Sequence, residues 1–175
     1  MNNTFLSRFP VRCVGIFTLL TLLAGCNPAQ KAVAPIELTR ETACSLDGMT
    51  LLDFPGPKGQ IQYSTGAPDF FCSTTEMFSI YLQPEQKKRI TGIFTQDMGK
   101  TGWDNPKGSW FDAKMGFYVL DSKKFGAMGP TLGAFTRRED AETFVKQHGG
   151  KVLKFDQVTI EMVSMSGSVL HDEPM

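Results

Sequence analysis

The chain has 175 residues, with 18 basic and 18 acidic side chains, 41% hydrophobic residues and four cysteines. This length is typical of one domain or two small ones. The balanced charge provides no basic surface of the kind that binds nucleic acid, so we exclude nucleic acid as an expected partner.

Residues 1–25 have the pattern of a secretory signal peptide. Arg8 and Arg12 form a positive region, and an apolar run from Val14 to Leu23 follows. The run is too short to span a bilayer comfortably, which favours a cleaved signal over a membrane helix. Cleavage removes two of the 18 basic residues and none of the 18 acidic ones, which leaves 16 against 18 and a formal charge of −2.

The segment Leu23-Ala24-Gly25-Cys26 resembles the lipobox of bacterial lipoproteins. The resemblance implies cleavage before Cys26, attachment of diacylglycerol to its sulfur and acylation of the new N-terminus. Several acyl chains anchor a protein stably, so we expect a periplasmic, lipid-anchored protein. Asn27 stands where a lipoprotein of the inner membrane often carries Asp, which favours the outer membrane. The alternative is an ordinary signal peptide with a coincidental cysteine.

Residues 26–42 are predicted to form a tether between the lipid and the folded body. They contain Pro28 and Pro35 among Ala, Gln and Lys, without apolar periodicity. Such a composition is typical of a linker that does not pack. A strand docked on the body is the alternative for Ile36–Leu38.

Residues 43–101 are predicted to form a first ββαβ half. Alternating polar and apolar residues indicate half-buried strands, and Pro and Gly mark the turns between them. Ser73 and Glu76 form a capping box, which predicts the start of a helix. The expected elements are strands at Met49–Phe54, Gln60–Tyr63 and Arg89–Asp97, and a helix from Ser73 to about Pro84.

Residues 102–156 repeat this scheme as a second ββαβ half. Thr136 and Glu139 form a second capping box, and Gly149-Gly150 closes the helix that follows. The expected strands are Gly116–Leu120, Leu132–Phe135 and Lys151–Phe155, preceded by a short extended piece at Ser109–Asp112. The fold class is therefore predicted to be α+β, with two tandem ββαβ units. Residues 157–175 form a C-terminal tail that carries Met and His.

Two cysteines remain as thiols, because Cys13 leaves with the leader and Cys26 is used for lipid. One disulfide between Cys44 and Cys72 is the default in an oxidising compartment. Cys44 and Met49, however, place two soft sulfur donors five positions apart, and such donors favour Cu(I). Gly48 permits a positive φ that folds the backbone back between them. A buried Met and a packed or paired Cys are the alternative.

Motifs for catalysis are missing from the sequence, so an enzyme is not expected. The chain has no Gly-rich phosphate loop, no His-Glu-x-x-His and no Cys-x-x-Cys, because Asp47 stands at the position of the second cysteine. Met128 precedes a glycine in a turn-like context, and His171 lies in the tail, so both are candidate soft-metal donors. Met77 and Met115 are assigned to packing.

Seven segments together are similar to the NosL family of accessory lipoproteins of nitrous oxide reductase, and the likeness runs from Cys44 to His171 and the C-terminus. They are Cys44–Met49, Gly56–Gln60, Gln96–Gly99, Trp110–Ala113, Tyr118–Val119, Met128–Pro130 and Gly149–Val152. The resemblance implies a tandem ββαβ fold distantly similar to organomercurial lyase. It also implies a periplasmic copper chaperone that binds Cu(I) and serves assembly of the catalytic copper centre of that reductase. Many family members carry Cys-x-x-Cys-Gly-Met, and this chain has Asp47 instead of the second cysteine.

These observations lead to one main hypothesis and two alternatives. The main hypothesis is a Cu(I) carrier, with nitrous oxide reductase and a copper-handling membrane transporter as candidate partners. Its expected copper ligands are Cys44, Met49, Met128 and His171. The first alternative is a metal-free structural or interaction lipoprotein with a Cys44–Cys72 disulfide. The second is an enzyme that cleaves C–S or C–metal bonds with Cys44, Cys72 and Asp47, which is disfavoured because kinship of fold does not carry activity.

Overall fold

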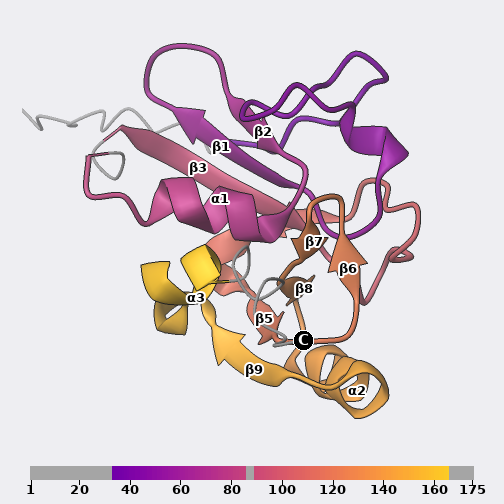
Figure 1. The fold of residues 1–175 in the computed structure, drawn as a ribbon. Helices are drawn as coiled ribbons and strands as arrows, with labels where there is room; N and C mark the ends of the chain where they lie inside the picture. Colours follow the sequence, from indigo (N-terminus) through magenta and orange to yellow (C-terminus); the bar gives the residue numbers. More distant parts are fainter. Residues whose placement is uncertain (1–32, 86–88, 166–175) are drawn as a thin grey trace, which may run out of the picture. The chain divides into compact units, whose positions relative to one another are not determined.

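The computed structural model describes residues 33–85 and 89–165. These residues contain three antiparallel sheets and three α-helices, joined by loops and 3-10 turns (Figure 1). The strands are β1 Gly59–Tyr63, β2 Asp69–Phe71, β3 Ile90–Gln96, β4 Trp110–Asp112, β5 Phe117–Leu120, β6 Phe125–Gly126, β7 Gly129–Pro130, β8 Gly133–Phe135 and β9 Lys151–Lys154. The helices are α1 Thr74–Tyr81, α2 Arg138–His148 and α3 Ile160–Met165. The mixed α+β class is confirmed.

The two larger sheets share one strand order. In the first, β1 lies between β2 and β3, and in the second, β5 lies between β8 and β9, with every pair antiparallel. A helix joins the last two strands in each case, α1 before β3 and α2 before β9. The first sheet also takes β4, which pairs with β3 although it comes from residues 102–156. The small β6–β7 sheet lies between β5 and β8 in the chain.

One hydrophobic core joins the two sheets. The ring of Phe78 on α1 meets the ring of Tyr118 on β5 edge to face at 4.9 Å. Both Met77 and Met115 were predicted to pack in the interior. Met77 is fully buried beside these rings, which confirms its prediction. Met115 is 74% exposed, so its prediction is wrong. Met115 lies in the 3-10 turn Ala113–Met115, which buries Ala113 and turns the methionine outward. The buried members of the core are Ile61, Phe71, Met77, Phe78, Ile93, Ala113, Tyr118, Leu120, Leu132, Ala134, Val158 and Val163.

The predicted strand at Met49–Phe54 is wrong. Thr50 bridges Ala43 across a tight hairpin, and Leu51–Asp53 then form a 3-10 turn. The N–H of Leu51 donates to the carbonyl of Thr42, and the N–H of Asp53 donates to the carbonyl of Thr50. The backbone therefore turns at once, and no extended run follows.

The two predicted capping boxes have different outcomes. Ser73 caps α1, because its hydroxyl accepts a hydrogen bond from the N–H of Glu76 at 3.1 Å. The helix α2 instead begins at Arg138 and has no side-chain cap. The hydroxyl of Thr136 donates to the carboxylate of Asp97, so it is used for a contact with another element.

Residues 34–36 are attached to the first sheet by two glutamine side chains of β1. The amide of Gln60 pairs with the N–H and carbonyl of Ile36 at 2.8 and 3.0 Å, and Gln62 donates to the carbonyl of Ala34 at 2.7 Å. This docked segment leads directly to Cys44. The lipobox with Cys26 lies outside the described residues, and none of the helices between 33 and 165 that the structure describes has the length and apolarity to cross a membrane.

Replacing Phe78 by Ala should lower the free energy of unfolding by about 3–5 kcal/mol, because a buried ring is lost and a cavity remains. Urea unfolding followed by circular dichroism measures the change. Phe125→Ala is the control, since that ring is 56% exposed. Equal losses in the two variants would contradict the assignment of Phe78 to the shared core.

Candidate metal centre

A tight hairpin presents Cys44. The N–H of Cys44 donates to the carbonyl of Met49 at 2.8 Å, and the N–H of Gly48 donates back to Cys44 at 2.9 Å. Gly48 has φ +78°, which confirms the predicted fold-back. The carboxylate of Asp47 accepts the N–H of Met49 at 2.9 Å and closes the turn.

The hairpin is fastened to β2, the strand that ends just before Cys72. Ser45 donates its N–H to the carbonyl of Phe70 at 2.8 Å, and the N–H of Phe70 donates to the hydroxyl of Ser45 at 3.0 Å. Cys44 and Cys72 are both buried free thiols in the structure. The attachment to β2 therefore brings two distant cysteines into one small hydrophobic cluster with Leu51.

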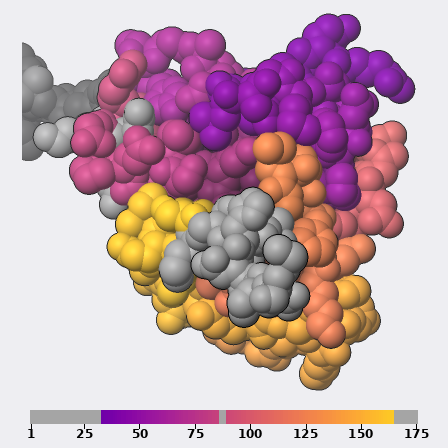
Figure 2. Space-filling view, viewed as in Figure 1, coloured from indigo at the N-terminus to yellow at the C-terminus, as the bar shows by residue number. Residues whose placement is uncertain are grey.

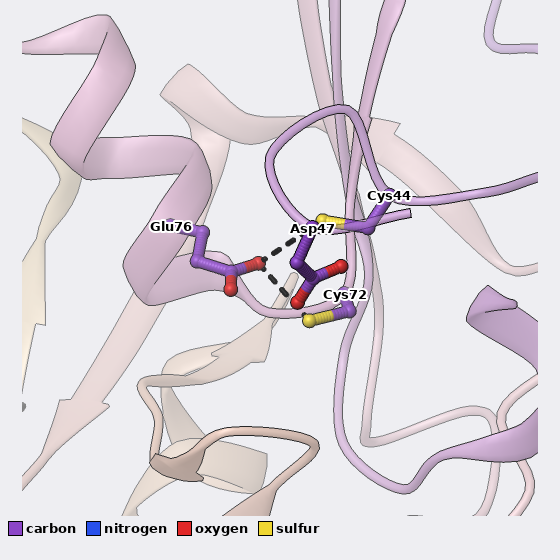
Figure 3. Close-up of side chains that lie close together, drawn as sticks. All are labelled: Cys44, Asp47, Cys72 and Glu76. Atoms are coloured by element: carbon purple, nitrogen blue, oxygen red, sulfur yellow. Dashed lines mark hydrogen bonds between the residues drawn. The ribbon is translucent and has the colours of Figure 1, made fainter. Parts of the chain in front are cut away.

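Two carboxylates lie close to the two thiols and form one group of candidate metal ligands with them. One ligand atom from each of Cys44, Asp47, Cys72 and Glu76 lies within 4.8 Å of all the others (Figure 3). Oε2 of Glu76 accepts hydrogen bonds from Sγ of Cys72 at 3.1 Å and from Sγ of Cys44 at 3.7 Å. Glu76 stands in the first turn of α1, so the cap at Ser73 fixes the helix end from which this carboxylate reaches the sulfurs.

Burial controls the protonation of the two thiols. It raises the pKa of Cys72 well above the ordinary value, and the hydrogen bond to Glu76 and the charge of that carboxylate add to the effect. Burial also raises the pKa of Cys44, although backbone N–H groups partly oppose it. Both thiols are therefore protonated at neutral pH, and a metal that binds them must displace protons.

Met128 lies near this group. It is 60% exposed in the turn between β6 and β7, and it lines a hollow of about 200 Å³ together with Glu76 and Ser73. The neighbouring Ala127 packs against the cluster of Cys44, Leu51 and Cys72. In Figure 2 the orange β6–β7 region lies against the indigo segment that contains the Cys44 hairpin.

The four expected ligands thus have different places. Cys44 is in the group with Cys72 and the two carboxylates, Met49 is half-buried and pairs with Cys44 across the hairpin, and Met128 lines the adjacent hollow. His171 lies outside the described residues, so the complete ligand set stays a prediction. The sequence left the role of Cys72 open and assigned Glu76 to a helix cap. One feature of the sequence could have indicated that Cys72 and Glu76 meet. They are four positions apart across the start of a helix.

Comparison with known proteins identifies the same family in every match reported below. The NosL family model matches residues 35–163. The chain is 34% identical over 167 residues to the copper-binding lipoprotein NosL of Stutzerimonas stutzeri, covering 90% of this chain and 87% of that protein. It is 36% identical over 162 residues to the protein of the same name from Achromobacter cycloclastes, covering 89% and 84%. The crystal structure of the copper chaperone NosL from Shewanella denitrificans is similar with a TM-score of 0.69 and 35% identity, over 73% of this chain and 96% of that one.

Replacing Glu76 by Gln should speed alkylation of the buried thiols in the folded, metal-free protein. The change removes a carboxylate that raises the pKa of both cysteines, and each pKa unit regained increases the thiolate fraction about tenfold. Iodoacetamide labelling between pH 7 and 10, followed by mass spectrometry, measures the rates. The profile of the wild type should lie at higher pH than that of the variant.

The control is Glu139→Gln, because the side chain of Glu139 is 70% exposed on α2. Its labelling profile should match that of the wild type. Coincident profiles for Glu76→Gln and the wild type would contradict the electrostatic role of Glu76.

Proposed function

The chain belongs to the NosL family, and on that premise we propose that it carries Cu(I) as cargo on its buried sulfurs. It is anchored through lipid on Cys26 and works in the periplasm, on the outer membrane. It delivers copper for assembly of the catalytic copper centre of nitrous oxide reductase, and a copper-handling membrane transporter is a second partner. The lipobox pattern and the names of the two relatives, both copper-binding lipoproteins, support the proposal.

The observation that carries the proposal is the meeting of Cys44 and Cys72. Two thiolates can hold Cu(I), which prefers soft sulfur donors, and their burial keeps water away from the ion. Asp47 replaces the second cysteine of the family's Cys-x-x-Cys-Gly-Met pattern. Cys72 supplies a second sulfur at the same place from another part of the chain.

Met128 supports a route for transfer. Its thioether is exposed beside the hollow that Glu76 also lines, so an ion leaving the buried sulfurs could pass to it and then to a partner by ligand exchange. Met49, which pairs with Cys44 across the hairpin, is a second thioether donor. His171 follows α3, whose Val163 and Ser164 line the same hollow, and we assign it the role of a displaceable ligand.

Cys44→Ser and Cys72→Ser should each weaken Cu(I) binding by about a hundredfold, because a hydroxyl is a poor ligand for this soft ion. The measurement is competition with a chromophoric Cu(I) chelator under reducing conditions. Met115→Leu is the control, since Met115 is 74% exposed and lines a hollow that neither cysteine lines. Unchanged affinity in either cysteine variant would remove that residue from the ligand set.

Thiol counting on protein taken directly from the periplasm separates this proposal from the metal-free alternative. A copper carrier should show two reactive thiols after unfolding without reductant, because Cys44 and Cys72 must stay reduced to bind. No reactive thiol would favour the Cys44–Cys72 disulfide.

Met128→Leu should slow the transfer of Cu(I) to an added chelator several-fold while changing the equilibrium affinity less than the cysteine variants do. The reason is that Met128 is exposed at the rim, whereas the cysteines are buried. Stopped-flow absorbance measures the transfer rate. Met115→Leu is the matched control, because Met115 is 74% exposed and lines a different hollow. Equal rates in the two variants would contradict a transfer role for Met128.

A further inference from the structure

Lys58 is a buried cation that the proposed function does not yet use. The residue is 1% exposed, and its Nζ donates to the carbonyls of Phe54, Pro55 and Gly56 at 2.8, 2.9 and 2.7 Å. An ammonium group has three protons, so these bonds use all of its donors. Lys58 therefore cannot donate a hydrogen bond to the metal centre and acts on it only through its charge.

Lys58 lies at the end of the strand pair that leads to Cys72. It immediately precedes β1, and the first residue of β1, Gly59, pairs with Phe71, the residue directly before Cys72. The peptide groups of Lys58 are also fixed, because its N–H donates to Gln96 and its carbonyl accepts from Thr95.

The protein keeps this charge despite the burial. Burial lowers the pKa of Lys58 to about 8, and the negative charge of Glu76 opposes that lowering. Asp47 and Glu76 bring negative charge to the surroundings of Cys72, and the positive charge of Lys58 interacts with Glu76.

Charge balance shows what such a cation does to metal binding. Both thiols donate their S–H to the carboxylate of Glu76. Binding follows 2 RSH + Cu⁺ → [Cu(SR)₂]⁻ + 2 H⁺, without electron transfer. The charge at the two sulfurs therefore changes from zero, for two neutral thiols, to −1 for the Cu(I) complex. With Zn²⁺ the same two thiolates form a neutral unit. A fixed positive charge beside Cys72 therefore stabilises the Cu(I) complex and has little effect on the Zn²⁺ complex.

We propose that Lys58 is a specificity-determining residue, whose buried charge near Cys72 favours Cu(I) over Zn²⁺ at the paired cysteines. This inference rests on the proposed function, because it requires Cys44 and Cys72 to hold the ion. A purely structural Lys58, needed only to hold the Phe54–Gly56 turn, would affect the binding of both metals alike. The ratio of the two affinities separates these roles.

The experiment measures Cu(I) and Zn²⁺ affinities of the reduced protein at one pH, each against a chromophoric chelator. Lys58→Met and Lys58→Gln should weaken Cu(I) binding by about tenfold or more, as expected for the loss of a nearby buried charge, and change Zn²⁺ binding less than about threefold. Lys58→Arg keeps the charge and should keep most of the Cu(I) preference. Lys107→Met, at an exposed lysine, makes the same change in net charge and should leave both affinities unaltered.

Equal changes for the two metals, or no change for either, would overturn the inference. Circular dichroism checks the fold of each variant. If every Lys58 variant unfolds, Arg included, the residue is a structural support and the inference is also overturned. A wild-type protein that binds no Cu(I) would overturn the proposed function itself, whereas wild-type Cu(I) binding that Lys58→Met leaves intact would overturn only the role of Lys58.

Discussion

The hydrogen-bonded attachment of Ser45 to Phe70 is the contact on which the proposed metal centre depends. It holds the Cys44 hairpin along β2, which is an edge strand of the first sheet. The hairpin thereby covers part of an exposed strand edge, a place where unpaired backbone groups need a partner. Because β2 ends just before Cys72, the same contact that satisfies the edge also brings the two sulfurs together.

The proposed metal centre and its surroundings combine ionisable side chains, of which Cys44, Cys72 and Lys58 are buried and Glu76 is half-buried. An unpaired charge removed from water costs several kcal/mol, so such groups are stable only with partners. Here the thiols remain protonated and share the carboxylate of Glu76, while three carbonyls hold the ammonium group of Lys58. The arrangement suits reversible binding, because the entry of a metal is linked to the loss of protons and its release to their return.

The proposed metal centre lies where the two larger sheets differ. Their first three strands share one order, and Cys72 after β2 corresponds in position to Thr136 after β8. Thr136 bonds to Asp97, whereas Cys72 lies with Cys44, Asp47 and Glu76. The Cys44 hairpin precedes the first sheet, and the β6–β7 turn with Met128 lies between two strands of the second. The site therefore depends on segments that the two sheets do not share.

Local patterns in the sequence determined the elements whose signals lie within a few residues. The alternation in β1, the cap at Ser73 and the turn at Gly48 follow from such signals, and the resemblance identified the family. The strand expected at Met49–Phe54 and the packing of Met115 were wrong, because neighbouring hydrogen bonds and a 3-10 turn overrode those patterns. Only the tertiary structure brought Cys72 and Glu76 to Cys44. Their proximity depends on strand register and on the docking of a hairpin to a distant strand, and contacts of that range leave no periodic trace in the sequence.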